Sequence, residues 1–206
     1  MEKYFDRLEK EPLIAERWKK IEELESYGIK AFGSKYDKQI MIGDILKHNP
    51  EENLKFKTAG RIMSLRGKGK VYFAHIEDQS GKIQIYIKKD ELGEDEFDHI
   101  VKMLNVGDII GVEGELFITH TEELTLRVKS ISLLTKNVRS LPEKYHGLTD
   151  VEIRYRKRYV DLIMNPEVRD TFIKRTQIIK AVRKYLDDRG FLEVETPLMH
   201  PILGGA

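Results

Sequence analysis

The chain has 206 residues, of which 40% are hydrophobic and 34% are charged, a composition that favours a folded protein over a disordered one. Its 36 Lys and Arg residues nearly balance its 35 Asp and Glu residues, so any affinity for nucleic acid must come from a local patch of charge. The sequence contains no cysteine, which excludes disulfides, thiolate zinc sites and cysteine nucleophiles. No apolar run approaches the roughly 20 residues that span a bilayer, and no signal peptide is recognisable, so we expect a cytoplasmic protein without membrane contact.

A helix is predicted close to the N-terminus. Pro12 suits the first turn of a helix, and Gly28 suits the position just after its end. The charged residues of this segment carry both signs, so we expect a solvated face, with contact to RNA as the alternative. Apolar residues recur at spacings of three and four, as a helix with one buried face requires; they are Ile14, Trp18, Ile21 and Leu24.

From Phe56 onwards the hydrophobic pattern changes to a period of two. In Lys82–Lys88 three isoleucines alternate with Gln84 and Tyr86, which predicts a half-buried strand. Four more strands are predicted, together with a short helix between the third and fourth strands. This order is typical of the five-stranded OB barrel, which binds oligonucleotides on strands 2 and 3 and on the loops joining strands 1 to 2 and 4 to 5. The other strands are expected near residues 56–66, 70–78, 108–119 and 123–134, and the helix near 94–105.

The loop between the first two predicted strands is basic. Arg66–Lys70 contains three cations, two glycines and no acid. Glycine lets the backbone approach a phosphate closely, so Lys68 and Lys70 are candidate phosphate contacts. A tight turn with solvated lysines is equally consistent with these residues.

Three further side chains are candidates for contacting bases. Phe73 would be a stacking platform if it points outward, although its position alone is more often a core position. Gln84 is expected to be exposed, because the neighbouring isoleucines face the core, and its amide can donate and accept hydrogen bonds. Glu123, in the loop between the last two strands, is an acceptor that could equally be an ordinary turn residue.

Four cations follow the barrel, and they either face RNA or pair with acids of a missing domain; they are Arg154, Arg156, Lys157 and Arg158. A long helix is then predicted, with Asn165 as its cap, Pro166 in its first turn and Gly190 just past its end. Its apolar stripe must be covered by the barrel, by a partner chain or by nothing. The stripe is formed by Val168, Phe172, Ile179, Val182 and Leu186.

Five strings of this sequence, in this order, resemble the class II lysyl-tRNA synthetases of bacterial type. The resemblance covers the chain from about residue 10 to its last residue. The barrel alone would also fit the aspartyl and asparaginyl relatives, whereas the third and fourth strings and the final Gly-Gly-Ala are specifically similar to the lysyl family. The strings are Gly60–Arg66, Lys82–Ile87, Leu141–Leu148, Arg154–Leu162 and Gly190–Pro197.

For the barrel, the resemblance implies a domain that reads the anticodon of tRNA(Lys). Phe73 matches the aromatic residue that stacks on the central anticodon base, Gln84 the amide that reads this base, and Arg66 the basic residue beside it. Glu123 matches a glutamate that reads a neighbouring anticodon base. The resemblance therefore favours binding roles for Phe73 and Glu123. Glu122 departs from the family pattern, because many relatives carry glycine there.

For the C-terminal part, the resemblance implies motif 1 of a class II synthetase, which builds a homodimer interface. It also implies that Gly204 lies at the edge of the amino-acid pocket. The expected division is an N-terminal helical segment (1–55), the OB domain (56–136), a linker (137–165) and the start of the catalytic domain (166–206). The expected dimer residues are Phe172, Ile179, Val182, Leu186 and Pro197.

The fold class expected from these observations is mainly β with flanking helices (α+β), and the expected enzyme is one that joins lysine to tRNA(Lys) with ATP and Mg²⁺. The strings of motifs 2 and 3, which handle ATP in this family, do not occur in the 206 residues. We therefore expect no catalytic residue, metal or cofactor in this chain, and tRNA binding without catalysis. The alternatives are a standalone tRNA-binding or regulatory module, and a general single-strand-binding OB protein.

Overall fold

The computed structural model describes residues 11–33, 35–52, 54–142 and 148–197. The chain divides into two compact units, Met1–Leu141 and Pro142–Ala206, and each is described by itself. None of the helices in the described ranges combines the length and the apolar character that a membrane crossing requires.

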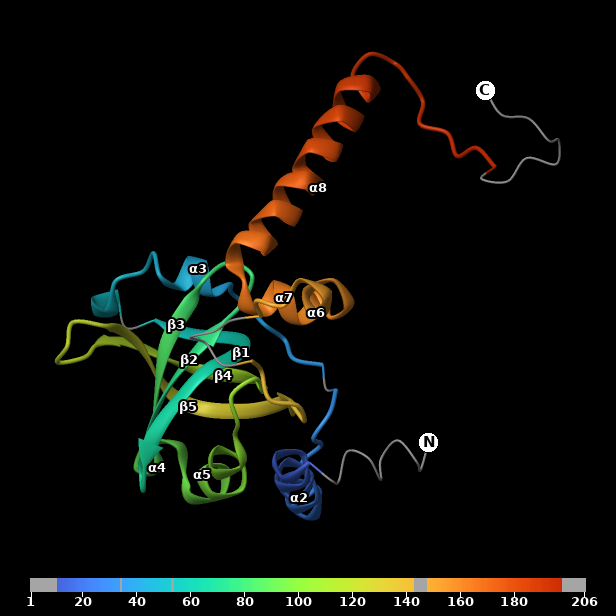
Figure 1. Cartoon of the computed structure of the whole chain (residues 1–206). Helices are drawn as coiled ribbons and strands as arrows, with labels where there is room; N and C mark the ends of the chain where they lie inside the picture. Colours follow the sequence, from blue (N-terminus) through green and yellow to red (C-terminus); the bar gives the residue numbers. More distant parts are fainter. Residues whose placement is uncertain (1–10, 34, 53, 143–147, 198–206) are drawn as a thin grey trace. The chain divides into compact units, whose positions relative to one another are not determined.

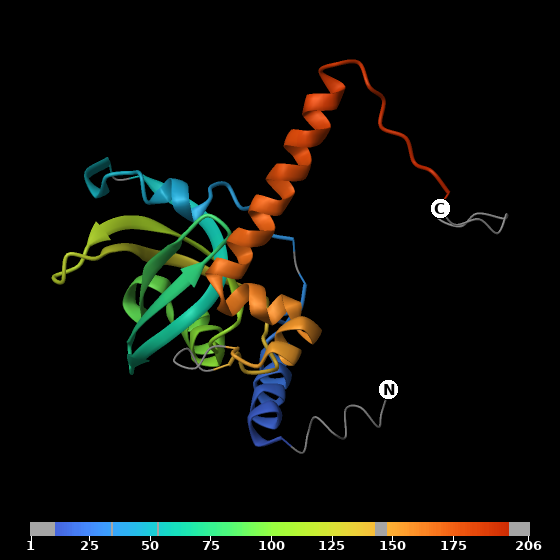
Figure 2. The same ribbon diagram turned by 45° about the horizontal axis from the view of Figure 1, so that its top comes forward.

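The first unit is built around a closed barrel of five strands in the order β1-β2-β3-β5-β4 (Figures 1 and 2). All neighbouring strands are antiparallel except β3 and β5, which pair in parallel. The predicted OB barrel is therefore confirmed. The strands are β1 (Lys55–Lys68), β2 (Val71–Glu77), β3 (Lys82–Lys88), β4 (Ile109–Ile118) and β5 (Leu124–Thr135).

Short helices surround the barrel. The predicted N-terminal helix is α2, which buries Ile14, Ile21 and Leu24, while Trp18 is half-buried. The segment between β3 and β4 brings the fully buried Phe97 into the core. The helical elements of this unit are α2 (Pro12–Ser26), α3 (Ile42–Ile45), η1 (Pro50–Glu52), α4 (Lys89–Leu92), α5 (Glu94–His99) and η2 (Val101–Met103).

The core fills the inside of the barrel with one face of each strand. On β3, Ile83, Ile85 and Ile87 are buried, as the alternating pattern predicted, and Ala74 and Ile76 oppose them from β2. Burying a side chain of this size stabilises a fold by roughly 1.5–3 kcal/mol. Side chains alternate between the two sides of a strand, so the residues between these positions leave the barrel on its outer face.

A buried ion pair holds the far end of β5. The Nζ atom of Lys136 lies 2.6 Å from Asp108 Oδ2, and both side chains are 0% exposed. Lys136 also donates to the Met103 carbonyl oxygen and to Asn105 Oδ1. Burial lowers the pKa of Lys136, and the attraction of Asp108 counteracts this effect. Because removing one partner of such a pair leaves a buried charge alone, we regard this contact as a strong constraint on the barrel end.

The second unit contains three helices, α6 (Val151–Arg156), α7 (Arg158–Met164) and α8 (Pro166–Asp187). Its organising contact is the fully buried carboxylate of Asp161, which accepts from Arg154 Nε (2.9 Å), Asn165 Nδ2 (2.6 Å) and Arg158. Burial by itself would raise the pKa of Asp161, but the hydrogen bonds from Asn165 and Arg154 lower it. Arg154 and Arg158 therefore pair with an acid of their own unit, and not with acids of a missing domain.

Asn165 occupies the N-cap position of α8, but its side chain makes no capping hydrogen bond. The amide instead donates to Asp161. The expectation that this side chain caps the helix is therefore wrong: the charge-assisted hydrogen bond from Nδ2 to Asp161 orients the amide, and its Oδ1 accepts from none of the first backbone N–H groups of α8.

The turn between β2 and β3 is fixed by Asp78. Its carboxylate accepts from the backbone N–H groups of Ile42 (2.9 Å) and Gly81 (3.0 Å), pairs with Lys38 and is 8% exposed. Burial by itself would raise the pKa of Asp78, but the hydrogen bonds from Ile42, Lys38 and Ser80 outweigh it and lower the pKa to about 2. The ionised carboxylate therefore stabilises the contact between this turn and α3.

Replacing Asp78 by Asn is expected to lower the free energy of unfolding by about 2 kcal/mol near pH 7. A lowered folded-state pKa gives stability that is present above the unfolded pKa and lost as the pH falls through the folded one. The difference between wild type and variant should therefore shrink between about pH 4 and about pH 2. Urea unfolding followed by circular dichroism measures this difference.

The exposed carboxylate of Asp44 provides the control, because an Asp44→Asn change should alter stability by less than about 0.5 kcal/mol at either pH. A difference for Asp78→Asn that is equally large at neutral and acid pH would contradict the role of the charge.

Candidate nucleic-acid interface

Two neighbouring rows of paired residues cross the outer face of the barrel on β1, β2, β3 and β5. Each row is formed by residues that lie opposite one another in the strand register. The first, which we name the aromatic row, consists of Arg66, Phe73, Tyr86 and Arg127. The second, which we name the polar row, consists of Ser64, His75, Gln84 and Thr125.

The aromatic row and Phe117 of β4 together form a continuous aromatic surface with a cation at each end. The ring centres of Phe73 and Tyr86 are 5.0 Å apart, and those of Tyr86 and Phe117 are 5.7 Å apart. The guanidinium carbon of Arg66 lies 5.8 Å from the centre of the Phe73 ring, and that of Arg127 lies 4.6 Å from the centre of the Phe117 ring. Phe73 is half-buried on the outer face, so its ring is available for stacking.

A groove of about 590 Å³ lies beside this row, between Phe73 and the turn that joins β4 to β5. Its volume is in the range of small-molecule binding sites. Glu91 lines one side of the groove and pairs with Lys129 at 2.6 Å. The remaining lining residues are Val71, Phe73, Tyr86, Phe117, Ile118, Thr119, His120 and Arg127.

The structure corrects the expectation for Gln84, whose residue is only 3% exposed. Its amide Nε2 donates to Glu123, and its Oε1 accepts from Thr125 Oγ1 at 3.3 Å. The side chain leaves β3 on the outer face, as predicted, but the parallel pairing of β3 with β5 brings Thr125 and Glu123 over it. The group that faces solvent here is the Glu123 carboxylate, with 41% of its side chain exposed.

Two residues of this network were not among the candidates expected from the sequence. His75 Nε2 lies 2.9 Å from Glu123 Oε1, and His75 Nδ1 lies 2.9 Å from Ser64 Oγ. The strand alternation places His75 on the same side as Phe73, so the sequence pattern could have identified His75 as a candidate. Ser64 faces the same way only because the register of β1 shifts between Ile62 and Ser64, and no sequence pattern predicts this bulge.

The basic turn between β1 and β2 is shorter than predicted. The two strands extend to Lys68 and Val71, so that only Gly69 and Lys70 lie between them. Gly69 has a φ of 70°, which glycine adopts readily. Lys68, Lys70 and Arg66 are all exposed, so the end of β1 and the turn together present three cations at the end of the aromatic row.

The turn between β4 and β5 holds a strained residue next to Glu123. Glu122 has a φ of 60° and is the one non-glycine residue with positive φ in the described part of the chain. The backbone N–H of Glu122 donates to the Thr119 carbonyl at 2.9 Å, and that of Thr119 donates to the Glu123 carbonyl at 3.1 Å. The glycine that many relatives were expected to carry here would adopt this conformation without strain.

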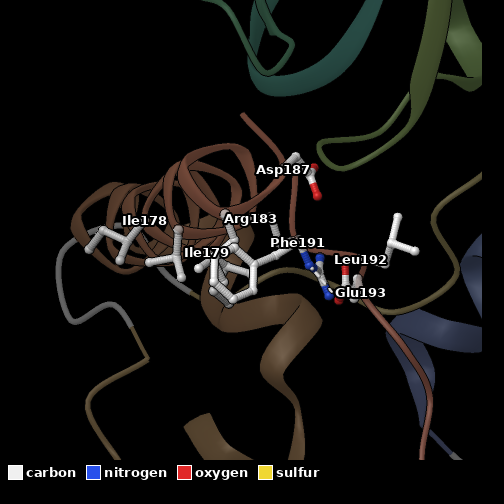
Figure 3. A pocket seen from close by; sticks show the side chains of 9 residues that line it. Ile178, Ile179, Arg183, Asp187, Phe191, Leu192 and Glu193 are labelled. Carbon is white, nitrogen blue, oxygen red and sulfur yellow. Dashed lines mark hydrogen bonds and ion pairs between the residues drawn. The ribbon is translucent and has the colours of Figure 1, made fainter. Parts of the chain in front are cut away.

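The candidate dimer residues belong to the second unit. Four of them lie on α8 and are exposed, as is Pro197. A groove of about 440 Å³ runs along this side of α8, where Ile178, Ile179 and Phe191 lie close together (Figure 3). Gly204 lies outside the described residues. The four candidate residues on α8 are Phe172, Ile179, Val182 and Leu186.

Among the described residues, no group of three or more His, Asp or Glu side chains is arranged to hold a metal ion.

Two family models match the chain. Residues 56–134 match the OB-fold nucleic acid binding domain, and residues 150–206 match the class II tRNA synthetases (D, K and N). The first match covers the barrel and both rows of residues, and the second covers α6, α7 and α8.

Curated relatives are similar over nearly the whole chain. It is 95% identical over 206 residues to the lysine–tRNA ligase of Fusobacterium nucleatum, of which it covers 42%. It is 52% identical over 195 residues, or 94% of the chain, to the lysine–tRNA ligase of Carboxydothermus hydrogenoformans, of which it covers 40%. It is 49% identical over 202 residues, or 94% of the chain, to the lysine–tRNA ligase of Halalkalibacterium halodurans, of which it covers 40%. The chain thus spans about two fifths of the length of these relatives.

Replacing Glu122 by Gly is expected to raise the free energy of unfolding by roughly 0.5–1 kcal/mol. Glycine removes the strain of the left-handed conformation, and its greater freedom in the unfolded chain offsets part of this gain. Chemical denaturation measures the change. A His120→Gly change in the same turn, at a residue without positive φ, should destabilise the protein instead. Equal effects of the two changes would show that the turn is not strained at Glu122.

Proposed function

We propose that the barrel of this chain binds the anticodon stem-loop of tRNA(Lys). The chain corresponds to the N-terminal part of the lysine–tRNA ligases. The observation that carries this proposal is the aromatic row with its flanking cations on the outer face of an OB barrel. Unpaired bases stack on such surfaces, and cations beside them attract the backbone phosphates. The anticodon loop of a tRNA presents such unpaired bases.

Each site residue has a role in this proposal. Phe73 stacks on the central anticodon base, and the Arg66 guanidinium lies over the same ring, 5.8 Å from its centre. Glu123 accepts hydrogen bonds from the N–H groups of a base. Because Gln84 is buried beneath Glu123, it acts by holding the carboxylate.

Lys68 and Lys70 are proposed to contact phosphates of the anticodon loop. They lie in the exposed turn at the Arg66 end of the aromatic row, and a phosphate contact needs only charge within reach. Their contribution should therefore fall as the salt concentration rises and should be the same for every RNA sequence.

For the longer protein we propose the attachment of lysine to tRNA(Lys) with ATP and Mg²⁺. The OB domain (56–136), after the N-terminal segment (1–55), would select the tRNA. A linker (137–165) would lead to the start of the catalytic domain (166–206), with Gly204 at the edge of its amino-acid pocket. The exposed apolar side of α8 supports a homodimer contact there. The proposed dimer residues are Phe172, Ile179, Val182, Leu186 and Pro197.

Replacing Phe73 by Ala is expected to weaken binding of the tRNA(Lys) anticodon stem-loop by roughly 1–3 kcal/mol, about 5- to 150-fold, because the stacking surface is lost. Phe73→Trp should retain most of the affinity. Fluorescence anisotropy with a labelled stem-loop measures the change.

The exposed aromatic residue Tyr27, outside the proposed interface, provides the matched control, since Tyr27→Ala should leave the affinity unchanged. Unchanged affinity of Phe73→Ala would remove Phe73 from the site. Equal affinity of the wild-type protein for stem-loops of different anticodon would favour a general single-strand binder.

The 206-residue chain is expected to show no lysine-dependent ATP–pyrophosphate exchange above background. Adenylate formation needs preorganised cations and metal around the phosphates, and the strings that supply them in this family do not occur in this sequence. The full-length lysine–tRNA ligase of Fusobacterium nucleatum serves as the active control. Exchange that increases with the concentration of the 206-residue chain would contradict the proposal that this chain binds tRNA without catalysing adenylate formation.

A further inference from the structure

The Glu123 carboxylate is held at both of its oxygen atoms. Oε1 lies 2.9 Å from His75 Nε2, and Oε2 accepts from the Gln84 amide. Two donors on separate oxygens fix the plane of a carboxylate as well as its position, as paired donors do in bidentate contacts. Glu123 is therefore restrained although 41% of its side chain is exposed.

The Glu123 carboxylate fixes the direction of its hydrogen bond with His75. An ionised carboxylate can only accept, so Nε2 of His75 must carry a hydrogen atom. In a neutral imidazole the other nitrogen is then an acceptor, and the Ser64 hydroxyl, 2.9 Å away, donates to it. Ser64 thus orients the ring, and the ring orients Glu123.

The fold builds this arrangement with a β-bulge. Ile62 pairs with Ile76 and Ser64 pairs with His75, so that Met63 is an extra residue in β1. A bulge redirects the side chains that follow it, and here it turns Ser64 to the same face as His75. The side chain of His75 is only 20% exposed, compared with 41% for Glu123. His75 is thus placed to hold the carboxylate and is poorly placed to contact RNA itself.

We propose that His75 is a positioning residue of the interface, which holds Glu123 in the orientation that accepts N–H donors from one anticodon base. This inference rests on the proposed function of the barrel. Stacking on Phe73 and contacts with phosphates do not depend on the orientation of Glu123. The loss of His75 should therefore reduce discrimination between bases and leave the affinity for non-matching RNA unchanged.

The test compares the full 206-residue chain and its variants in binding the tRNA(Lys) anticodon hairpin and hairpins with single anticodon substitutions. His75→Phe keeps an aromatic ring and removes both nitrogens, and it is expected to lower the selectivity for the matching hairpin roughly five-fold. His75→Gln, which keeps an N–H donor, should restore most of it. His48→Phe makes the same change at a histidine that precedes η1 and pairs with Glu52, and it should leave selectivity unchanged.

A merely structural role of His75 is separated from a positioning role by a double-mutant comparison. In a Glu123→Gln background, which weakens the charge-assisted contact, His75→Phe should produce little further loss of selectivity. An additive loss would overturn the inference. If His75→Phe unfolds the protein, Ser64→Ala replaces it in the test, because it removes only the hydroxyl that orients the ring and should lower selectivity about two-fold.

The outcomes distinguish this inference from the proposed function. The positioning role would be overturned if His75→Phe kept full selectivity while Glu123→Gln lost it, and the proposed function would remain. Where His75→Phe does not fold, Ser64→Ala takes its place in this comparison. Equal binding of all hairpins by the wild-type protein would overturn both.

Discussion

The parallel pairing of β3 with β5 is the constraint on which the proposed interface depends. It consists of three residue pairs, Gln84 with Thr125, Ile85 with Leu126, and Tyr86 with Arg127. The middle pair closes the core, because Ile85 and Leu126 are both fully buried. The outer pairs extend the polar and aromatic rows onto β5. Without this closure the turn between β4 and β5 would not reach β3, and Glu123 would have neither Gln84 nor His75 beside it.

The same closure separates the side chains of the core from those of the proposed interface. The inner face is apolar and its residues serve packing, whereas the outer face carries rings, cations and a restrained carboxylate. The buried pair of Lys136 and Asp108 fixes the end of β5 beyond the rows, and Asp78 fixes the turn after β2. These contacts lie outside the interface, and a rigid scaffold of this kind allows the exposed side chains to bind without reorganising the backbone.

The barrel could be predicted because its strands follow from patterns of neighbouring residues in the sequence. The alternation in Lys82–Lys88 predicts a strand, and the order of the elements predicts the closed sheet. The burial of Gln84 could not be predicted, because alternation tells from which face a side chain leaves the strand and not what a distant segment places over it. The link from Ser64 to His75 depends on a bulge, and Asn165 turns to Asp161 instead of capping α8. The expected roles of Phe73 and Glu123 came from resemblance, and the geometry is compatible with both.

The most direct test of this account is to map the RNA contact by nuclear magnetic resonance. The amide spectrum of the labelled 206-residue chain would be recorded as the unlabelled anticodon stem-loop of tRNA(Lys) is added. We expect the largest shifts on the two rows and the adjoining turns, at residues 64–75, 84–86 and 117–127. Shifts that cluster on α2 or α8, with the outer face of β2 and β3 unchanged, would contradict the assignment of this face as the binding surface.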